Sequence, residues 1–164
     1  MIEMKIELTV STTIAAPPSA VYALVADMPR FSEWSPENIH TEWTCDTPAV
    51  VGATFLGRNR NADNGFEWDA AGVVTVADGE REFVFAMGDV DDPIATWRYQ
   101  LTPEGDATVV TESFSLGTGQ SLFRDLMGRV PADQLPDALA RRGAQLSEGM
   151  QATLAGMKAE LEQA

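Results

Sequence analysis

Glu112 is the residue whose type and position most clearly suggest chemistry. It alternates with Val110, Phe114 and Leu116, so an extended strand would point its carboxyl group to the same side as these apolar residues. Burial raises the pKa of a carboxyl group, and a buried carboxyl can act as a general acid or base or can bind a ligand hydroxyl. The alternative is that Glu112 lies near a sheet edge or a bulge, where it reaches water or a basic residue.

Several aromatic residues are spaced to lie on the same inward side of the predicted strands, namely Trp43, Trp68, Phe85, Trp97 and Tyr99. An aromatic wall suits flat or ring-bearing ligands. The alternative is that most of these side chains fill the core, because a domain of this size needs large side chains in its interior.

Asn59 is a candidate for orienting a ligand. It shares strand parity with Phe55 and Gly57, which would place its amide on the inward side. There the amide could both donate and accept hydrogen bonds.

The same parity places Arg58 and Arg60 on the outer side, where Glu67 and Asp69 of the next strand can pair with them. A register shift of one residue would reverse this arrangement and point both arginines inward. Leu56 supports the reversed arrangement, because an exposed leucine beside two arginines is unexpected. Parity alone favours the outward arrangement.

The charge balance argues against some partners. The chain has 164 residues, and its 25 acidic and 11 basic residues give a net charge of −14. Such a surface repels nucleic-acid phosphates and anionic lipid headgroups, so we expect neither a nucleic-acid partner nor membrane insertion. No apolar run approaches the roughly 18 residues that span a bilayer, and the N-terminus lacks the basic-then-apolar order of a signal peptide. We therefore expect a cytoplasmic protein.

Residues that bind metals or form nucleophilic triads are too few or poorly spaced. Cys45 and His40 are the single cysteine and the single histidine, which is short of a zinc site, and His40 has outward parity with no acid or nucleophile near it. Asp89, Asp91 and Asp92 lack the later glycine and glutamate of a calcium loop. No glycine-rich phosphate loop precedes a helix, so we expect no metal, no nucleotide and no cofactor.

A simple order of elements in one domain, residues 1–164, positions these side chains. Alternating apolar residues predict a first strand over 5–14, and prolines followed by apolar residues predict helical segments over 17–28 and 29–34. Six further strands are predicted over 39–45, 51–60, 68–76, 83–87, 95–101 and 110–116, with an acidic loop over 88–93. A short helix within 122–130 and a long helix over 136–164 complete the chain.

The long helix should cover the apolar face of a strongly curved sheet. Its apolar residues form one stripe about 100° wide, namely Leu139, Leu146, Met150, Leu154, Met157 and Leu161. Thr153 also falls on this stripe, where its hydroxyl could meet a ligand or could bond back to the preceding helical turn. Gly149 and Gly156 weaken the helix, so a close approach of another segment is expected at them.

Five segments carry a resemblance to a known superfamily: 31–37 (FSEWSPE), 51–60 (VGATFLGRNR), 95–99 (ATWRY), 110–113 (VTES) and 149–154 (GMQATL). With the order of elements, they resemble the SRPBCC superfamily of START-like and birch-pollen-allergen-like proteins, and in particular its polyketide cyclase/dehydrase-like branch. The resemblance implies an α+β helix-grip fold. In this fold a curved antiparallel sheet of about seven strands wraps around the C-terminal helix and leaves an internal cavity.

The resemblance also implies a ligand site for a hydrophobic small molecule, with an entrance lined by residues 61–65, 87–94 and 117–135. Leu122, Phe123 and Leu126 would then be lid residues, although ordinary packing of a connecting helix gives the same amphipathic pattern. The expected ligand-binding residues are Trp34, Trp43, Phe55, Asn59, Trp68, Phe83, Phe85, Trp97, Tyr99, Glu112, Phe114, Phe123, Leu126, Met150, Thr153, Leu154 and Met157.

Three functions are consistent with the resemblance. The leading hypothesis is a carrier or sensor that binds a hydrophobic, ring-bearing molecule in the cavity. The second is an enzyme of the polyketide cyclase or aromatase kind, in which Glu112 and Tyr99, together with Asn59, would move protons during aldol closure and loss of water. The third is a protein-interaction module resembling the Hsp90-cochaperone members of the superfamily. The sequence leaves open whether the protein is a monomer or a homodimer.

Overall fold

The computed structural model describes residues 3–163 of the chain. Its elements are β1 (Glu7–Ile14), α1 (Pro18–Val25), the 3-10 helix η1 (Met28–Glu33), β2 (Asn38–Trp43), β3 (Thr54–Arg60), β4 (Glu67–Asp78), β5 (Glu82–Asp89), β6 (Asp92–Glu104), β7 (Ala107–Leu116), α2 (Leu122–Met127) and α3 (Leu135–Glu162). This is the order that the sequence predicts.

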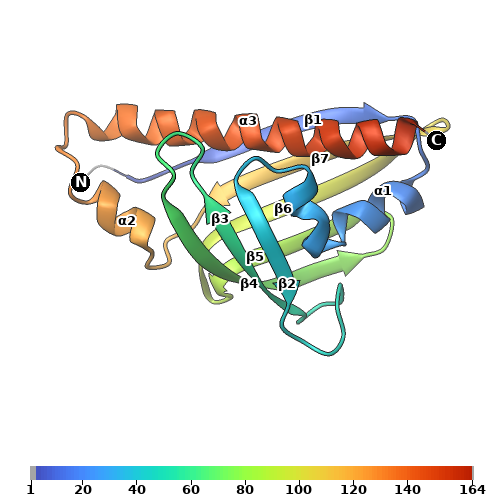
Figure 1. Ribbon diagram of the computed structural model, residues 1–164, viewed down its shortest axis with the longest axis horizontal. Helices are drawn as coiled ribbons and strands as arrows, with labels where there is room; N and C mark the ends of the chain where they lie inside the picture. The colour runs from blue at the N-terminus through green and yellow to red at the C-terminus, as the bar shows by residue number, and fades with distance from the viewer. Residues whose placement is uncertain (1–2, 164) are drawn as a thin grey trace.

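The seven strands form one antiparallel sheet in the order β1-β7-β6-β5-β4-β3-β2. Strands β2 to β6 each pair with the next strand in sequence, and β7 also pairs with β1. The sheet curls, and α3 runs across its open side, with α1 and η1 near one end of the helix and α2 near the other (Figure 1). The predicted α+β helix-grip fold is confirmed.

Turn and cap residues account for several boundaries. Pro18 occupies the first turn of α1, where its missing N–H is not needed. Ser121 caps α2 by accepting a hydrogen bond from the backbone N–H of Arg124 at 3.2 Å. In the hairpin between β3 and β4, Gly65 has a φ of 73°, a backbone conformation that favours glycine.

The buried side chains form two clusters along α3. The larger cluster contains Leu154 and Met157 of the C-terminal half of α3, together with side chains of α1, η1 and the sheet. The smaller cluster contains Leu135, Leu139, Leu146 and Met150 from the N-terminal half and the middle of α3, together with Ile6, Ala95 and Phe114. The apolar stripe predicted for the final helix is therefore its buried face, but it is shared between two clusters.

Two local predictions were wrong. Alternation within the predicted strand 39–45 places Ile39 inward with Thr41, yet Ile39 is exposed, because the β2–β3 register shifts between Asn38 and His40. The segment 88–93, predicted as a loop, is a tight hairpin in which β5 extends to Asp89 and β6 begins at Asp92.

Candidate functional site

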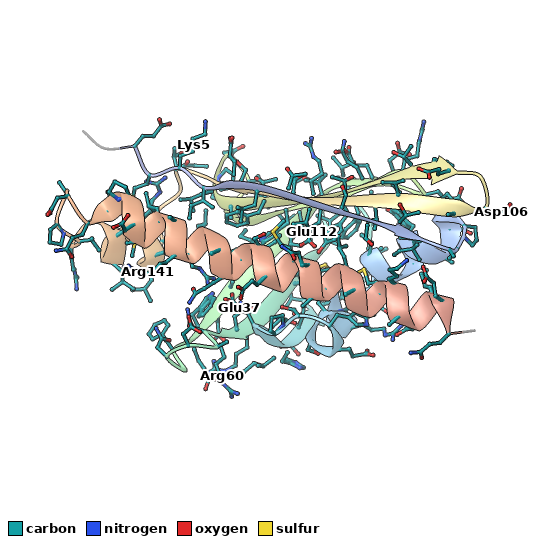
Figure 2. The ribbon with its side chains drawn as sticks, turned by 90° about the horizontal axis from the view of Figure 1, so that it is seen from above. Lys5, Glu37, Arg60, Asp106, Glu112 and Arg141 are labelled. Carbon is teal, nitrogen blue, oxygen red and sulfur yellow. The ribbon has the colours of Figure 1, made fainter. Side chains whose placement is uncertain are left out.

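Tyr99 and Glu112 form a buried polar pair on the inner face of the sheet. They lie directly opposite each other on β6 and β7 and are only 1% and 2% exposed. The Tyr99 hydroxyl donates a hydrogen bond to Glu112 Oε2 at 2.9 Å. Figure 2, which views the molecule from the side of α3, shows Glu112 near the middle of the helix. The inward orientation predicted for Glu112 is confirmed.

The second oxygen of the Glu112 carboxyl group is unusual. Within residues 3–163, this atom, Oε1, is the one buried side-chain nitrogen or oxygen without a hydrogen-bond partner. Burial raises the pKa of Glu112 to about 8, although the hydrogen bond from Tyr99 lowers it. Burial, and then the nearby Glu112 charge, also raise the pKa of Tyr99 well above its ordinary value. At neutral pH the carboxyl group is therefore mainly protonated and can donate a hydrogen bond into the apolar interior.

Aromatic rings surround this pair. Phe85 stacks on Tyr99 with ring centroids 6.5 Å apart, and Phe31 of η1 meets Tyr99 edge-on at 5.9 Å. Farther along the same strands, Trp97 and Phe114 lie 4.7 Å apart. Such edge-to-face and offset pairs are the arrangements that aromatic side chains prefer. The Tyr99 ring therefore packs against two other aromatic rings, which restrict where its hydroxyl can lie.

Most of the side chains expected to line a cavity pack against one another in the two clusters. Phe55, Phe83, Phe85, Tyr99, Leu154 and Met157 are buried in the larger cluster, and Phe114 and Met150 in the smaller one. Trp97 packs partly buried against both. Thr153 is buried on α3, where its hydroxyl donates to the backbone oxygen of Gly149 at 2.8 Å, so the back-bonding alternative is the one observed.

Three of the tryptophans that were expected to bind a ligand are not among the rings that pack against Tyr99. Trp34 follows η1 and packs against the larger cluster at Gly156, and Trp43 meets Phe55 edge-on at 6.0 Å. Trp68 is half-buried at the start of β4, where it stacks on Phe66 at 6.2 Å. The structure therefore does not bring Trp68 into contact with the aromatic group around Tyr99.

The predicted register of β3 is confirmed. Arg58 forms ion pairs with Glu67 at 3.1 Å and with Asp69 at 2.8 Å on the outer face. Asn59 is half-buried and accepts a hydrogen bond from the side-chain amide of Asn38 at 3.2 Å. Asn59 thus bonds to the edge strand β2, and its own strand β3 is four strands away from β7, which carries Glu112.

The segment predicted as a lid contains α2, which lies over the smaller cluster. Phe123 packs partly buried against that cluster, together with Met127 and Val130. Leu122 and Leu126 are 51% and 44% exposed. All six residues of α2 are described, and none of them is buried. This helix is therefore the least embedded of the elements around the site.

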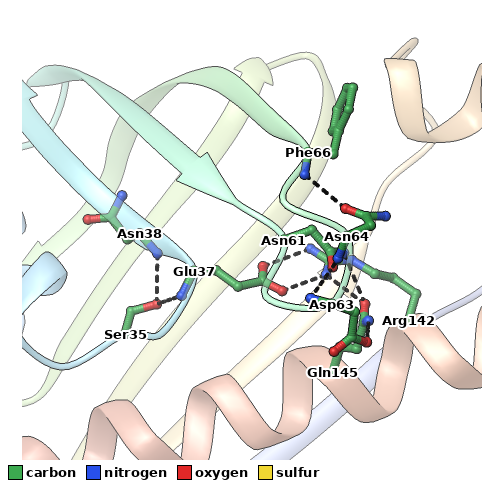
Figure 3. Close-up of polar contacts among 9 residues, drawn as sticks. All are labelled: Ser35, Glu37, Asn38, Asn61, Asp63, Asn64, Phe66, Arg142 and Gln145. Atoms are coloured by element: carbon green, nitrogen blue, oxygen red, sulfur yellow. Dashed lines mark hydrogen bonds and ion pairs between the residues drawn. The ribbon is translucent and has the colours of Figure 1, made fainter.

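A polar cluster that the sequence did not reveal joins α3 to the hairpin between β3 and β4 (Figure 3). Arg142 donates two hydrogen bonds to the Glu37 carboxylate, at 2.7 and 2.9 Å, and lies over the Trp68 ring at 5.6 Å. Gln145 accepts a hydrogen bond from Asn61 at 3.3 Å and also bonds Asp63. Arg142 and Gln145 lie off the apolar stripe of the final helix, where solvent exposure is the usual expectation. The cluster depends on a contact between segments about a hundred residues apart, and no local pattern carries that information.

Two hollows lie along the N-terminal half of α3. One, of about 150 Å³, lies among Pro36, Asp63, Gln145 and Gly149 beside the polar cluster. The other, of about 490 Å³, is an open groove between β1 and α3, lined by Ile6, Leu8, Leu139 and Gly143 among others.

In the described part of the chain, no three His, Cys, Asp or Glu side chains gather so that they could hold a metal ion. Among residues 3–163, no helix is both long enough and apolar enough to cross a membrane.

Comparisons with known proteins agree with the helix-grip fold. Residues 5–162 match the family described as polyketide cyclase / dehydrase and lipid transport. A polyketide-cyclase-like protein of Corynebacterium glutamicum, solved by NMR, is 33% identical with a TM-score of 0.67, and the alignment covers 99% of this chain and 94% of that one. No curated protein matched the chain significantly in sequence.

More distant structures share the fold. A START superfamily protein of Mycobacterium smegmatis is 13% identical with a TM-score of 0.66, over 96% of this chain and 98% of that one. The di-domain ARO/CYC protein StfQ of the steffimycin biosynthetic pathway is 15% identical with a TM-score of 0.75, over 97% of this chain and 51% of that chain. This protein thus corresponds to about half of the di-domain chain. By its sequence match and its helix-grip fold, the chain belongs to the polyketide cyclase/dehydrase and lipid-transport family of the START-like SRPBCC superfamily.

Proposed function

We propose that this protein binds a hydrophobic, ring-bearing small molecule between α3 and the sheet, as a carrier or sensor, with the Tyr99–Glu112 pair at the polar end of the site. One observation carries the proposal: among the described residues, Glu112 Oε1 is buried without a hydrogen-bond partner. Leaving a buried polar atom unpaired costs about 1–3 kcal/mol, which a ligand group bonded to that atom would offset.

The chemistry of the pair restricts the ligand. A protonated Glu112 can donate to a ketone or hydroxyl oxygen, and the surrounding rings suit a flat molecule. Among residues 3–163, the buried polar side chains are Thr41, Thr108, Glu112 and Thr153, so no Lys, Arg or His is buried where it could neutralise a bound anion. A carboxylate ligand would therefore be disfavoured, and a neutral ring compound with one oxygen function is the ligand class that fits.

Two measurements test this proposal. Native mass spectrometry of the purified protein should show a bound species that is lost on denaturation and organic extraction. Titration with three ring compounds, followed by tryptophan fluorescence, should rank 2-naphthol above naphthalene and naphthalene above 2-naphthoate. The variant Glu112→Leu should remove the preference for 2-naphthol over naphthalene. Equal binding of the carboxylate, or no bound species together with no titration, would contradict the proposal.

A polyketide cyclase-type activity is the second candidate, and the hydrogen bond between Tyr99 and Glu112 favours it. During aldol closure, an enol carbon of the substrate would attack a carbonyl carbon, and the Glu112 carboxyl group would give its proton to the oxygen of that carbonyl. The resulting carboxylate, stabilised by the Tyr99 hydroxyl, would take up the proton that the enol oxygen loses as it becomes a ketone. A synthetic poly-β-ketone thioester, followed by chromatography and mass spectrometry, tests this candidate. Glu112→Gln should keep binding but lose cyclisation, and equal cyclisation rates with and without the protein would exclude it.

A further inference from the structure

Strand β1 lies at one end of the sheet, and its outer edge runs along α3 (Figure 1). Within residues 3–163 it pairs with β7 alone. The Leu116 N–H bonds to the Ile6 oxygen, so Ile6 points its main-chain groups towards β7. In an antiparallel pair this direction alternates from one residue to the next. The main-chain groups of Lys5, Glu7 and the following odd-numbered residues therefore point to the free edge.

Side chains of α3 occupy the C-terminal part of this edge. Lys158 donates to the backbone oxygen of Thr13 at 2.6 Å, and Glu162 accepts a hydrogen bond from the Ala15 N–H at 2.9 Å. Both main-chain groups belong to odd-numbered residues, which agrees with the alternation. Proteins commonly cover or charge a sheet edge in this way to prevent another strand from pairing with it. This part of the edge is therefore closed to a partner.

The N-terminal part of the edge faces the open groove of about 490 Å³. Residues 3 and 5–8 line the groove on the strand side, so side chains of both faces of the sheet border it, and the groove follows the strand edge itself. A Cβ on Gly143 would lie 3.8 Å from Ile6 and 3.9 Å from Leu8, so helix and strand meet at the floor of the groove. Above the floor, α3 presents the exposed Ala140 and Ala144, whose methyl groups offer no hydrogen bond to the strand edge.

The charges along the groove restrict what could pair with this edge. Its charged side chains are Glu3, Lys5 and Glu7, and the Lys5 ammonium lies 3.6 Å from the Glu7 carboxylate. Opposite charges on directly facing residues stabilise a strand pair, so basic residues fit opposite Glu3 and Glu7. Apolar residues fit on the inward side, next to Ile6 and Leu8. A second copy of the chain fits poorly, because two molecules with a net charge of −14 each repel one another.

We propose that the groove between β1 and the N-terminal half of α3 binds an extended segment of a partner protein, in which basic and apolar residues alternate and which adds to the sheet beside β1. Hydrogen bonds to the main chain of Lys5 and Glu7 would supply affinity, and the carboxylates of Glu3 and Glu7 would select basic residues. This docking surface lies at the sheet edge and does not depend on ligand binding at the Tyr99–Glu112 pair.

A synthetic peptide tests the docking surface. The sequence Val-Lys-Val-Thr-Val-Lys-Val, with blocked ends and a fluorescent label, can place its lysines opposite Glu3 and Glu7 and its threonine opposite Lys5. Fluorescence anisotropy in about 0.15 M salt should show binding to the full chain. Replacing both lysines by glutamate should weaken binding about tenfold or more. Methylating the main-chain nitrogens of both lysines keeps the charge but removes the hydrogen bonds to β1, and should also weaken binding about tenfold.

Two protein variants locate the binding site. Ala140→Trp places a large side chain in the groove and should weaken peptide binding about tenfold, whereas Ala152→Trp, at an exposed alanine of α3 outside the groove, should leave it unchanged. Amide hydrogen exchange followed by NMR should show that the peptide slows exchange at Glu7 about tenfold and leaves Leu8, which faces β7, unchanged.

Several results would overturn the proposal. Failure of the peptide to bind would do so, and equal binding of the methylated peptide would show that charge attraction alone holds it. Equal effects of Ala140→Trp and Ala152→Trp would place the binding site elsewhere. Dimers that form without peptide and are disrupted by Ala140→Trp would show, in analytical ultracentrifugation, that a second copy occupies the groove instead.

Discussion

At Gly156, the backbone of α3 lies directly against the Trp34 indole. A Cβ at this position would lie 2.5 Å from Trp34 Cδ1 and 2.9 Å from two further atoms of the same side chain. The glycine lets the helix approach the turn after η1, at a loss of helix propensity of up to about 1 kcal/mol. It explains why the sequence keeps a weak helix former in the C-terminal half of α3.

Gly156→Ala should therefore destabilise the protein. The added methyl group forces Trp34 or the helix to shift, and such overpacking lowers the free energy of unfolding by about 1–3 kcal/mol. Urea denaturation followed by circular dichroism measures the change. Gly149→Ala is the matched control, because its Cβ meets only ordinary contacts and should raise the stability by up to about 1 kcal/mol. Stabilisation by both substitutions would refute the close approach at Trp34.

The stability of the protein should depend on pH through Glu112. Burial raises the pKa of this carboxyl group from 4.5 to about 8, so between these values the folded protein holds a proton that the unfolded chain has released. The contribution of Glu112 is therefore fully present below pH 4.5 and is lost as the pH rises towards about 8. Within that window, each pH unit lowers the free energy of unfolding by up to about 1.4 kcal/mol.

Glu112→Gln isolates this effect. The amide is neutral at every pH and can still accept the hydrogen bond from Tyr99, so the variant should unfold at similar urea concentrations to the parent at pH 5 and at higher ones at pH 8. Other carboxylates titrate equally in both proteins and cancel in the difference. Parallel stability curves for the two proteins from pH 5 to pH 8 would show that the carboxyl group is not protonated in the folded state.

Tyr99→Phe should raise the pKa of Glu112 further, because the Tyr99 hydroxyl is the group that lowers it. Loss of this buried hydrogen bond should also lower the free energy of unfolding by about 1–3 kcal/mol. Carbon-13 NMR of the glutamate carboxyl groups follows the titration directly. Tyr22→Phe, at a half-buried tyrosine of α1 that contacts Phe83, is the control and should leave the Glu112 titration unchanged. A lower pKa in Tyr99→Phe would contradict the pairing.

Glu37→Gln should lower the free energy of unfolding by about 1–3 kcal/mol, because it leaves the partly buried Arg142 charge with a neutral partner. The loss should persist in 1 M salt, since salt screens buried pairs weakly. Asp69→Asn, which weakens an exposed ion pair of Arg58, should have a much smaller effect. Equal effects of the two substitutions in urea denaturation would show that the Glu37–Arg142 pair is no stronger than a surface pair.

Periodicity alone predicted the elements and the inward direction of several key side chains. Alternation with a period of two placed Glu112 inward and Arg58 outward, and a period of 3.6 gave the buried stripe of α3. These features are local, because each depends only on the spacing of residues within one strand or helix. The bulge in β2 that exposes Ile39 lay beyond this reasoning, because it changes the spacing itself.

The tertiary structure alone decided which side chains from distant segments contact one another. Arg142 lies on the polar side of a helical pattern, and only the folded chain brings it to Glu37, Trp68 and the hairpin after β3. Likewise, parity shows that Tyr99 and Glu112 both face inward, but their pairing at 2.9 Å depends on the register between β6 and β7. The sequence determined the buried face of α3 and the inward side of most strands, because these follow from local periodicity. Their contacts were decided by packing between distant segments, which no local pattern encodes.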